Sequence, residues 1–193
     1  MRIEPLDESD WDDNTRSAAL AMRPNRSGGR TDARPWDPAA MPVNEWADVL
    51  ARHPALVAVW WPLNTYMVTR GSLPVRDREL AILRIAWLCQ SPYQWKTHSV
   101  MAPALGLDPA EVDRVRAGSE ADGWSEADRA VLRAVDELHR TARVGDETWA
   151  ALAARWDERQ LIELPFLVGQ YQTFAFALNT LGVVVPEWDA PIA

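Results

Sequence analysis

The segment from Arg76 to Leu107 places a glutamate and a histidine on two helical patterns that a Ser-Pro break separates. After Glu79, apolar residues cover most of a helix surface, which predicts a helix buried on more than one side. These residues are Leu80, Ile82, Leu83, Ile85, Ala86, Trp87 and Leu88. Glu79 is therefore expected in an apolar neighbourhood, where an acid that meets an imidazole has the parts for proton chemistry.

The break itself predicts the start of the second helix. Ser91 is a typical N-cap residue, Pro92 suits the first helical position, and Gln94 stands where it can reach back as in a capping box. Residues at offsets of three, four and seven from Ser91 share roughly one helix face. They are Gln94, Trp95 and His98. His98 is thus expected two turns into this helix, on the face that carries the cap.

This block resembles the carboxymuconolactone decarboxylase family of the alkylhydroperoxidase D-like superfamily. Redox members of that superfamily carry a glutamate, then a Cys-x-x-Cys pair, then a histidine four residues after the second cysteine. Glu79 and His98 stand at the matching positions, whereas Ser91 and Gln94 occupy the places of the two cysteines. The resemblance implies an all-α helical bundle, homo-oligomers (often trimers or hexamers), and a non-redox member with His98 and Glu79 as catalytic residues.

Thiol and metal chemistry find little support in the sequence. The only cysteine, Cys89, lies two residues before the first cysteine position of the motif and has no partner for an intrachain disulfide. A single thiol also leaves no cysteine cluster for zinc. A metal site built from His98, Glu79 and His139 lacks the i, i+4 histidine pair that would favour it. No metal and no cofactor are therefore expected.

Length and charge restrict the remaining classes. A chain of 193 residues is expected to form one domain with a sizeable core. The formal net charge of -8 argues against a nucleic-acid partner, because binding phosphates needs clustered Lys and Arg. The acidic N-terminus has no apolar signal region, and no run of 18 apolar residues occurs. A cytoplasmic protein that does not contact membranes is expected.

The domain organisation is read from helix signals and breakers, since no alternating strand pattern occurs. Residues 1–40 are predicted to form an arm with little regular structure that docks through Trp11 and Trp36, followed by a helical domain over 41–183 and an extended tail over 184–193. Caps and apolar spacing predict further helices over about 45–50, 55–67, 109–118, 126–142, 147–155 and 158–180. Pro165 is a possible kink in the last of these.

Each candidate site residue also has a purely structural interpretation. Glu79 can be a first-turn acid paired to an arginine, and His98 a satisfied core histidine. Ser91 is explained by capping more readily than by nucleophilic attack, and Gln94 is either its capping partner or a substrate ligand. Tyr93 can donate to a substrate oxygen or pack with a wet tip. The other predicted substrate-binding residues are Trp95, Trp60 and Tyr171, the last on a helix whose polar residues Gln170 and Asn179 can line a pocket or bond across helices.

Three functional hypotheses remain open. In the first, His98, tuned by Glu79, moves a proton to or from a small cyclic or conjugated carboxylate, lactone or enone, as a decarboxylase, another lyase or an isomerase would. The second is a residual thiol peroxidase that uses Cys89, which the missing cysteine pair argues against. The third is a protein that binds small molecules without turnover. The expected partners are a small-molecule substrate and further copies of the chain, in keeping with the eleven tryptophans spread along it.

Overall fold

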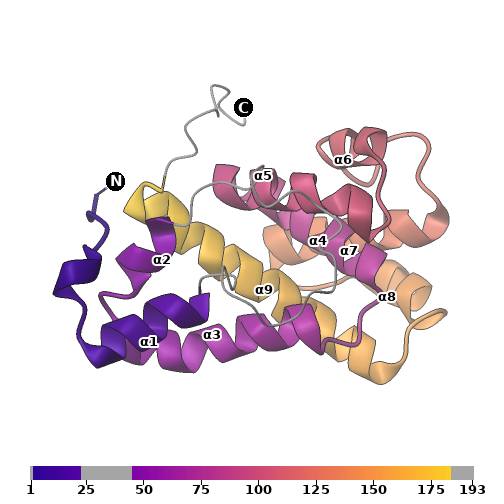
Figure 1. The fold of residues 1–193 in the computed structure, drawn as a ribbon. Coiled ribbons are helices and arrows are strands. Elements are labelled where there is room, and N and C mark those ends of the chain that lie inside the picture. Colours follow the sequence, from indigo (N-terminus) through magenta and orange to yellow (C-terminus); the bar gives the residue numbers. More distant parts are fainter. Residues whose placement is uncertain (1, 23–44, 184–193) are drawn as a thin grey trace.

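The computed structural model describes residues 2–22 and 45–183, and within these ranges it consists of helices and connecting turns without strands. The expected all-α class is therefore confirmed. Figure 1 shows the arrangement of the elements. They are η1 (Glu8–Asp10), α1 (Asp13–Met22), α2 (Glu45–Leu50), α3 (Pro54–Thr69), α4 (Val75–Leu88), α5 (Pro92–Met101), η3 (Ala102–Leu105), α6 (Pro109–Val115), α7 (Glu126–Thr141), α8 (Asp146–Ala153) and α9 (Glu158–Leu181).

Helix α4 is the centre of the fold. It contacts α5, α6, α7 and α9, and the ten consecutive residues from Asp77 to Ala86 are all buried. The apolar residues from Leu80 onward cover most of the helix surface and explain this position, because they need neighbours on several sides. The expectation of a helix buried on more than one side is confirmed.

The charged residues of α4 reach polar partners on other helices. Asp77 accepts hydrogen bonds from Arg155 Nη2 at 2.7 Å and from Trp156 Nε1 at 3.0 Å. Arg84 pairs with Asp136 and donates to two carbonyl oxygens at the C-terminal end of α6, at 2.9 and 3.0 Å. Buried charges are tolerated only when they are paired and hydrogen-bonded. These contacts therefore fix the orientation of α4, and with it the direction in which Glu79 points.

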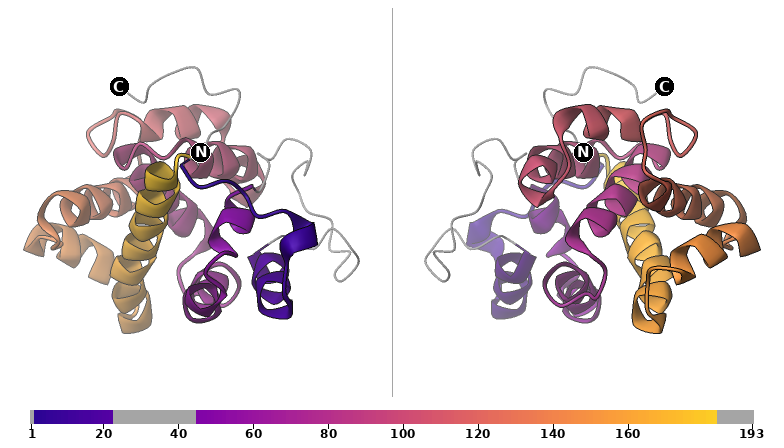
Figure 2. Two further views of the ribbon diagram at one scale, coloured as in Figure 1. Left: turned by 90° about the vertical axis from the view of Figure 1, so that its left-hand side faces the viewer. Right: turned by 90° about the vertical axis from the view of Figure 1, so that its right-hand side faces the viewer.

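The core consists of two apolar clusters that meet along α5 and α9. The first, called here the α4 cluster, includes Leu80, Ile82, Leu83, Ile85, Trp95, Val131, Leu132, Val135, Leu164, Leu167 and Tyr171. The second, called the N-terminal cluster, includes Trp11, Ala19, Met22, Trp46, Ala47, Val57, Tyr93, Phe174 and Leu178. Figure 2 shows α3 and α1 nearly end-on beside the steep α9, with α5 above them.

Most expected helices agree with the observed ones, and the differences lie at the ends of the chain. The arm over residues 1–40 was expected to have little regular structure, yet it contains α1, which packs on α3. Trp11 docks as predicted, with 9% of its surface exposed in the N-terminal cluster. Trp36, Asn44 and the tail over 184–193 lie outside the described residues. Helix α9 runs through Pro165 without interruption.

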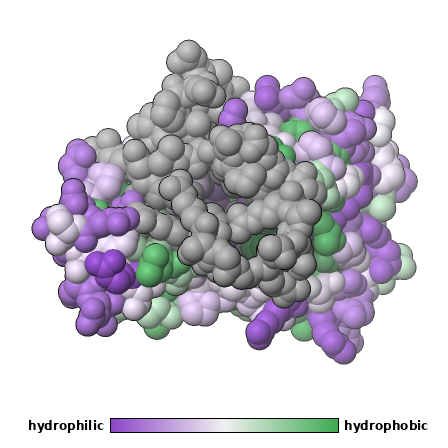
Figure 3. All heavy atoms as spheres, viewed as in Figure 1, coloured by the Kyte–Doolittle hydropathy of each residue, from purple (hydrophilic) through white to green (hydrophobic). Residues whose placement is uncertain are grey.

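The surface seen in Figure 3 carries hydrophilic side chains around much of its edge, in keeping with the acidic composition. None of the helices in the described ranges is long and apolar enough to cross a membrane. Several large apolar side chains of α3 and α9 remain exposed, among them Val59, Ile162, Phe166 and Phe176. Such side chains are compatible with subunit contacts, and the expected homo-oligomer stays a prediction.

Candidate active site

A tight connection between α4 and α5 brings Glu79 and His98 together. Gln90 adopts the left-handed conformation (φ 50°), and the Ser91 N–H donates to the Ala86 carbonyl oxygen at 2.9 Å, which closes the end of α4 as in a Schellman motif. Pro92 then occupies the first turn of α5. Because the two helices are joined so closely, Glu79 in the first half of α4 faces His98, which lies two turns into α5.

The central contact of the site is a short hydrogen bond between His98 Nδ1 and Glu79 Oε2, at 2.7 Å. Both residues are buried, with 8% of His98 and 1% of Glu79 exposed. An ionised carboxylate can only accept, so Nδ1 carries the proton. When the ring is neutral, its lone pair therefore lies on Nε2. The proximity expected from the sequence is confirmed.

Arg78 is the second partner of Glu79, and the sequence interpretation assigned it no place in the site. Its Nε and Nη2 each lie 3.3 Å from Glu79 Oε1, and its Nη1 donates to the Val68 carbonyl oxygen at 3.1 Å. Only 9% of Arg78 is exposed. The result is a buried chain of charge from Arg78 through Glu79 to His98. The one sequence signal for it is that Arg78 directly precedes Glu79.

These neighbours decide the ionisation of the buried acids. Burial by itself would raise the pKa of Glu79, but the positive charges and hydrogen bonds of His98 and Arg78 outweigh burial and lower it. Tyr171 lies edge-on to His98, with ring centroids 5.3 Å apart. Burial, together with the negative charge of Glu79, raises the pKa of Tyr171, so the phenol stays protonated at neutral pH.

The lowered pKa of Glu79 predicts how stability depends on pH. A carboxyl group whose pKa is lower in the folded state contributes stability above its unfolded pKa of about 4.5, and this contribution is lost as the pH falls. We expect the difference in unfolding free energy between the wild type and Glu79→Gln to shrink as the pH falls below about 4.5. Urea unfolding between pH 3 and 7 measures it. Other acids titrate in both proteins and cancel, so a difference that stays constant at all pH values contradicts the prediction.

The expected capping box at the start of α5 is wrong in its hydrogen bonds. Ser91 is the N-cap residue, but its hydroxyl makes no cap hydrogen bond. Gln94 Nε2 instead donates to the backbone oxygen of Tyr171 at 3.0 Å. The Gln94 amide, which the local pattern assigned to the helix cap, therefore bonds to α9 instead. Ser91 Oγ and Gln94 Oε1 are both buried and have no hydrogen-bond partner.

Trp60 and Tyr93 extend the site toward the N-terminal cluster. Trp60 Nε1 donates to Gln170 Oε1 at 3.0 Å, and its ring lies 5.2 Å from Phe174. Tyr93 packs edge-on against Trp46 at 5.9 Å, and burial raises the pKa of its phenol. The polar residues of α5 and α9 therefore lie where the two apolar clusters meet.

Three other residues from the sequence interpretation have different surroundings. Trp95 packs against Trp87 at 5.2 Å within the α4 cluster, and the Arg116 guanidinium lies over both rings. Asn179 Nδ2 donates to the Cys89 carbonyl oxygen at 2.8 Å, so bonding between helices explains it. His139 is exposed, and Gln172 Oε1 lies 3.3 Å from its Nδ1. Within the described ranges, no group of three His, Cys, Asp or Glu residues could hold a metal ion.

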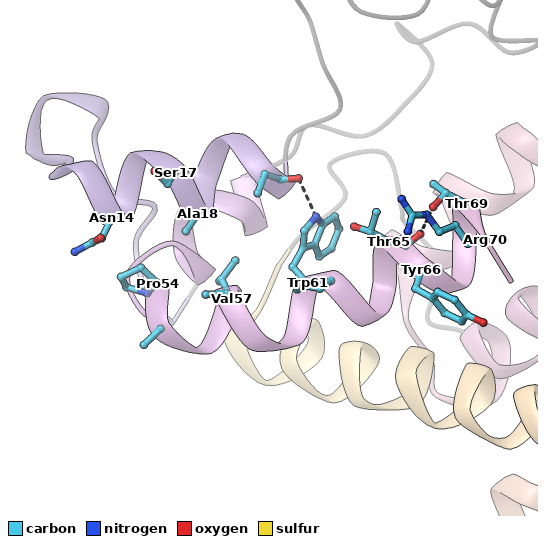
Figure 4. A pocket seen from close by; sticks show the side chains of 14 residues that line it. Asn14, Ser17, Ala18, Pro54, Val57, Trp61, Thr65, Tyr66, Thr69 and Arg70 are labelled. Atoms are coloured by element: carbon cyan, nitrogen blue, oxygen red, sulfur yellow. Dashed lines mark hydrogen bonds between the residues drawn. The ribbon is translucent and has the colours of Figure 1, made fainter.

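An open groove of about 860 Å³ lies between α1 and α3 (Figure 4). Trp61 stands at its wall and donates to the Ala21 carbonyl oxygen at 2.8 Å. Apolar side chains and a few neutral polar ones line most of the groove, and Arg70 lies at its end. None of the predicted site residues lines this groove.

Comparison with known families bears on the same segment. The sequence model of the carboxymuconolactone decarboxylase family matches residues 54–137, which include both members of the Glu79–His98 pair. The match covers less than half of the chain, and it shows that this segment carries the sequence pattern of the family. Within the segment, Ser91 and Gln94 stand where redox relatives would carry the Cys-x-x-Cys pair. Comparison with curated proteins finds no significant match.

Solved structures support the fold over a longer stretch. A protein of unknown function from Agrobacterium tumefaciens, ATU0492, described as a putative antioxidant defence protein AhpD, is 18% identical, with a TM-score of 0.65 over 72% of this chain and 96% of that one. An uncharacterised peroxidase-related protein from Ralstonia eutropha JMP134 gives a TM-score of 0.64 at 17% identity, over 74% of this chain and 76% of that one. The debrominase Bmp8, in complex with 2,3,4-tribromopyrrole, gives 0.71 at 14% identity, over 97% of this chain and 92% of that one. At such identities these likenesses establish the AhpD-like fold alone.

Proposed function

We propose that the protein is a cofactor-free acid-base enzyme in which His98 moves a proton to or from a small cyclic or conjugated substrate. The observation that carries this proposal is the buried 2.7 Å contact between His98 Nδ1 and Glu79 Oε2. The match of residues 54–137 to a family named for a decarboxylase supports a lyase-type reaction. The structural likeness to a debrominase is compatible with small-ring chemistry on this scaffold.

The residues define the proton's path. In the neutral ring, Nε2 takes a proton from a substrate carbon, and the imidazolium that forms is stabilised by the Glu79 carboxylate through Nδ1–H. The electron pair left on carbon enters the conjugated system of the substrate. Returning the proton to a different carbon completes an isomerisation, with no net change in protons on the enzyme.

Decarboxylation needs the same residues in the other protonation state. The electron pair of the bond to the carboxylate enters the substrate's own conjugated system as carbon dioxide leaves, and the imidazolium gives its proton to the carbon that receives the pair. An apolar site favours the loss of a carboxylate, because it destabilises the charged group. Arg78 is already held by Glu79 and the Val68 carbonyl oxygen, so it does not neutralise that carboxylate.

The test uses a panel of lactones, enones and unsaturated cyclic carboxylates with the purified full-length protein in deuterium oxide. The proposal expects incorporation of deuterium at carbon, or release of carbon dioxide, that depends on His98. Turnover that persists unchanged in His98→Asn would overturn it. Ligand-induced thermal stabilisation without turnover of any compound would favour the binding protein instead.

A thiol peroxidase is disfavoured by the surroundings of Cys89. Burial raises the pKa of its thiol from the ordinary value of 9.0 to about 11. At pH 7.5 this lowers the thiolate fraction about a hundredfold, which greater nucleophilicity of the thiolate offsets only in part. We expect Cys89 to react with 5,5′-dithiobis(2-nitrobenzoate) at least about tenfold more slowly than free cysteine. Cys89→Ser should leave any hydroperoxide consumption unchanged, and a loss in that variant would restore the peroxidase hypothesis.

A further inference from the structure

Two buried glutamine side chains, Gln94 on α5 and Gln170 on α9, have hydrogen-bonding ends whose character is fixed. Gln94 Nε2 donates to the backbone oxygen of Tyr171, an atom that can only accept, so its free end is the acceptor Oε1. Gln170 Oε1 accepts from Trp60 Nε1, an atom that can only donate, so its free end is the donor Nε2. Neither amide can be reversed without losing its partner.

Both free ends are buried without a partner. Gln94 is 2% exposed and Gln170 5% exposed, and neither Gln94 Oε1 nor Gln170 Nε2 makes a hydrogen bond. Ser91 Oγ, which is fully buried, is in the same condition. Leaving a buried polar atom unpaired destabilises a fold, and each case in a folded protein calls for an explanation. A bound molecule that pairs with Gln94 Oε1 and Gln170 Nε2 would satisfy both of these atoms.

The two amides meet the same turn of α9. Gln94 bonds to the backbone of Tyr171, which directly follows Gln170 and packs edge-on to His98 with ring centroids 5.3 Å apart. Trp60, which bonds to Gln170, adds an aromatic ring from α3, and its centroid lies 5.2 Å from that of Phe174. Flat apolar walls next to one donor and one acceptor suit a planar ring with a polar edge.

We propose that Gln94 and Gln170 form a substrate subsite for a neutral planar ring that carries an N–H or O–H donor beside a carbonyl acceptor. The ring's donor bonds to Gln94 Oε1, and its carbonyl oxygen accepts from Gln170 Nε2. The inference rests on the proposed function in that the ring is held next to His98. A carboxylate does not fit both amides, because it offers acceptors only and would face the acceptor Gln94 Oε1. If the substrate is decarboxylated, the carboxylate that leaves as carbon dioxide is therefore a different group from the one bound by Gln94 and Gln170.

The test measures binding of two matched probes to the full-length protein by tryptophan fluorescence and calorimetry. The compound 2-pyridone carries adjacent N–H and C=O groups, and N-methyl-2-pyridone lacks the donor. We expect the wild type to bind 2-pyridone about tenfold more tightly than the N-methyl compound, the effect of one hydrogen bond. Gln94→Met should abolish this preference, and Gln170→Met should weaken both probes by a similar factor, about tenfold. Gln172→Met, on the same helix but bonded to His139, should change neither affinity.

Several results would overturn the subsite. They are equal affinity of the wild type for the two probes, no binding of 2-pyridone at about 10 mM, tighter binding of benzoate than of 2-pyridone, and a preference that survives in Gln94→Met. The wild-type comparison alone is decisive if a variant fails to fold. His98→Asn should still bind 2-pyridone, so a loss of turnover with intact binding separates failure of the proposed reaction from failure of this subsite.

Discussion

Replacing Arg78 with methionine is expected to lower the free energy of unfolding by about 3 kcal/mol, because it leaves the Glu79 carboxylate buried without its guanidinium. Glu79 is 1% exposed, and Arg78 contributes two contacts at 3.3 Å. Breaking a buried pair by removing one partner costs about 3–5 kcal/mol. The lower end applies here because His98 still binds the carboxylate. Urea unfolding at pH 7 measures the change.

A matched arginine on the surface supplies the control. Arg133 pairs with Glu147 at 3.2 Å, and the Glu147 side chain is 90% exposed. Arg133→Met should cost no more than about 1 kcal/mol, as exposed ion pairs do. The double variant Arg78→Met with Glu79→Gln should be more stable than Arg78→Met alone, since it removes the unpaired charge. If Arg78→Met is no more destabilising than Arg133→Met, the buried chain of charge does not exist in solution.

His98→Asn is expected to lower kcat/KM by about a hundredfold to ten-thousandfold, because it removes the group that carries the proton. Asparagine can still donate one hydrogen bond to Glu79, so the buried carboxylate keeps a partner and the fold is retained. Glu79→Gln should cause a smaller loss, since it removes the charge that stabilises the imidazolium but leaves the imidazole in place. Steady-state turnover of the substrate found in the panel measures both variants.

The control for these variants is His139→Asn. His139 lies on α7, outside the segment from Arg76 to Leu107. It is exposed and contacts Gln172. Its replacement should leave kcat/KM unchanged. Circular dichroism and thermal melting of all three variants separate a loss of chemistry from a loss of fold. Equal losses in His98→Asn and His139→Asn would argue that His98 has no special role.

The sequence predicted the individual helices well because their signals are local. Asp108 and Asp157 cap their helices, and a Glu or Gln three residues later completes a capping box at each. The helix predicted to begin at residue 147 begins at Asp146, with Gly145 as its N-cap. The N-terminal arm was underestimated, because α1 gains its stability by packing on α3 and its own apolar pattern is short.

The candidate site was predicted in part. The positions of Glu79 and His98 on two closely joined helices, together with their match to the family motif, indicated the contact that the structure shows. The partners that come from far along the chain were not predictable in the same way. Gln94 matched a local cap, and only the approach of α9 showed that its amide bonds to Tyr171. Nothing in the residues around Trp60 indicates that its indole meets Gln170.

The sequence by itself therefore determined the helical class, the pairing of Glu79 with His98 and the absence of the cysteine pair, because each depends on residue identity and on spacing within about two turns of a neighbouring helix. Only the tertiary structure decided what surrounds that pair. Arg78 turns toward Glu79, and the amides of Gln94 and Gln170 are oriented by α9 and α3. Such contacts depend on how helices distant in the chain pack together, since a buried polar atom takes whichever partner the packing brings within reach.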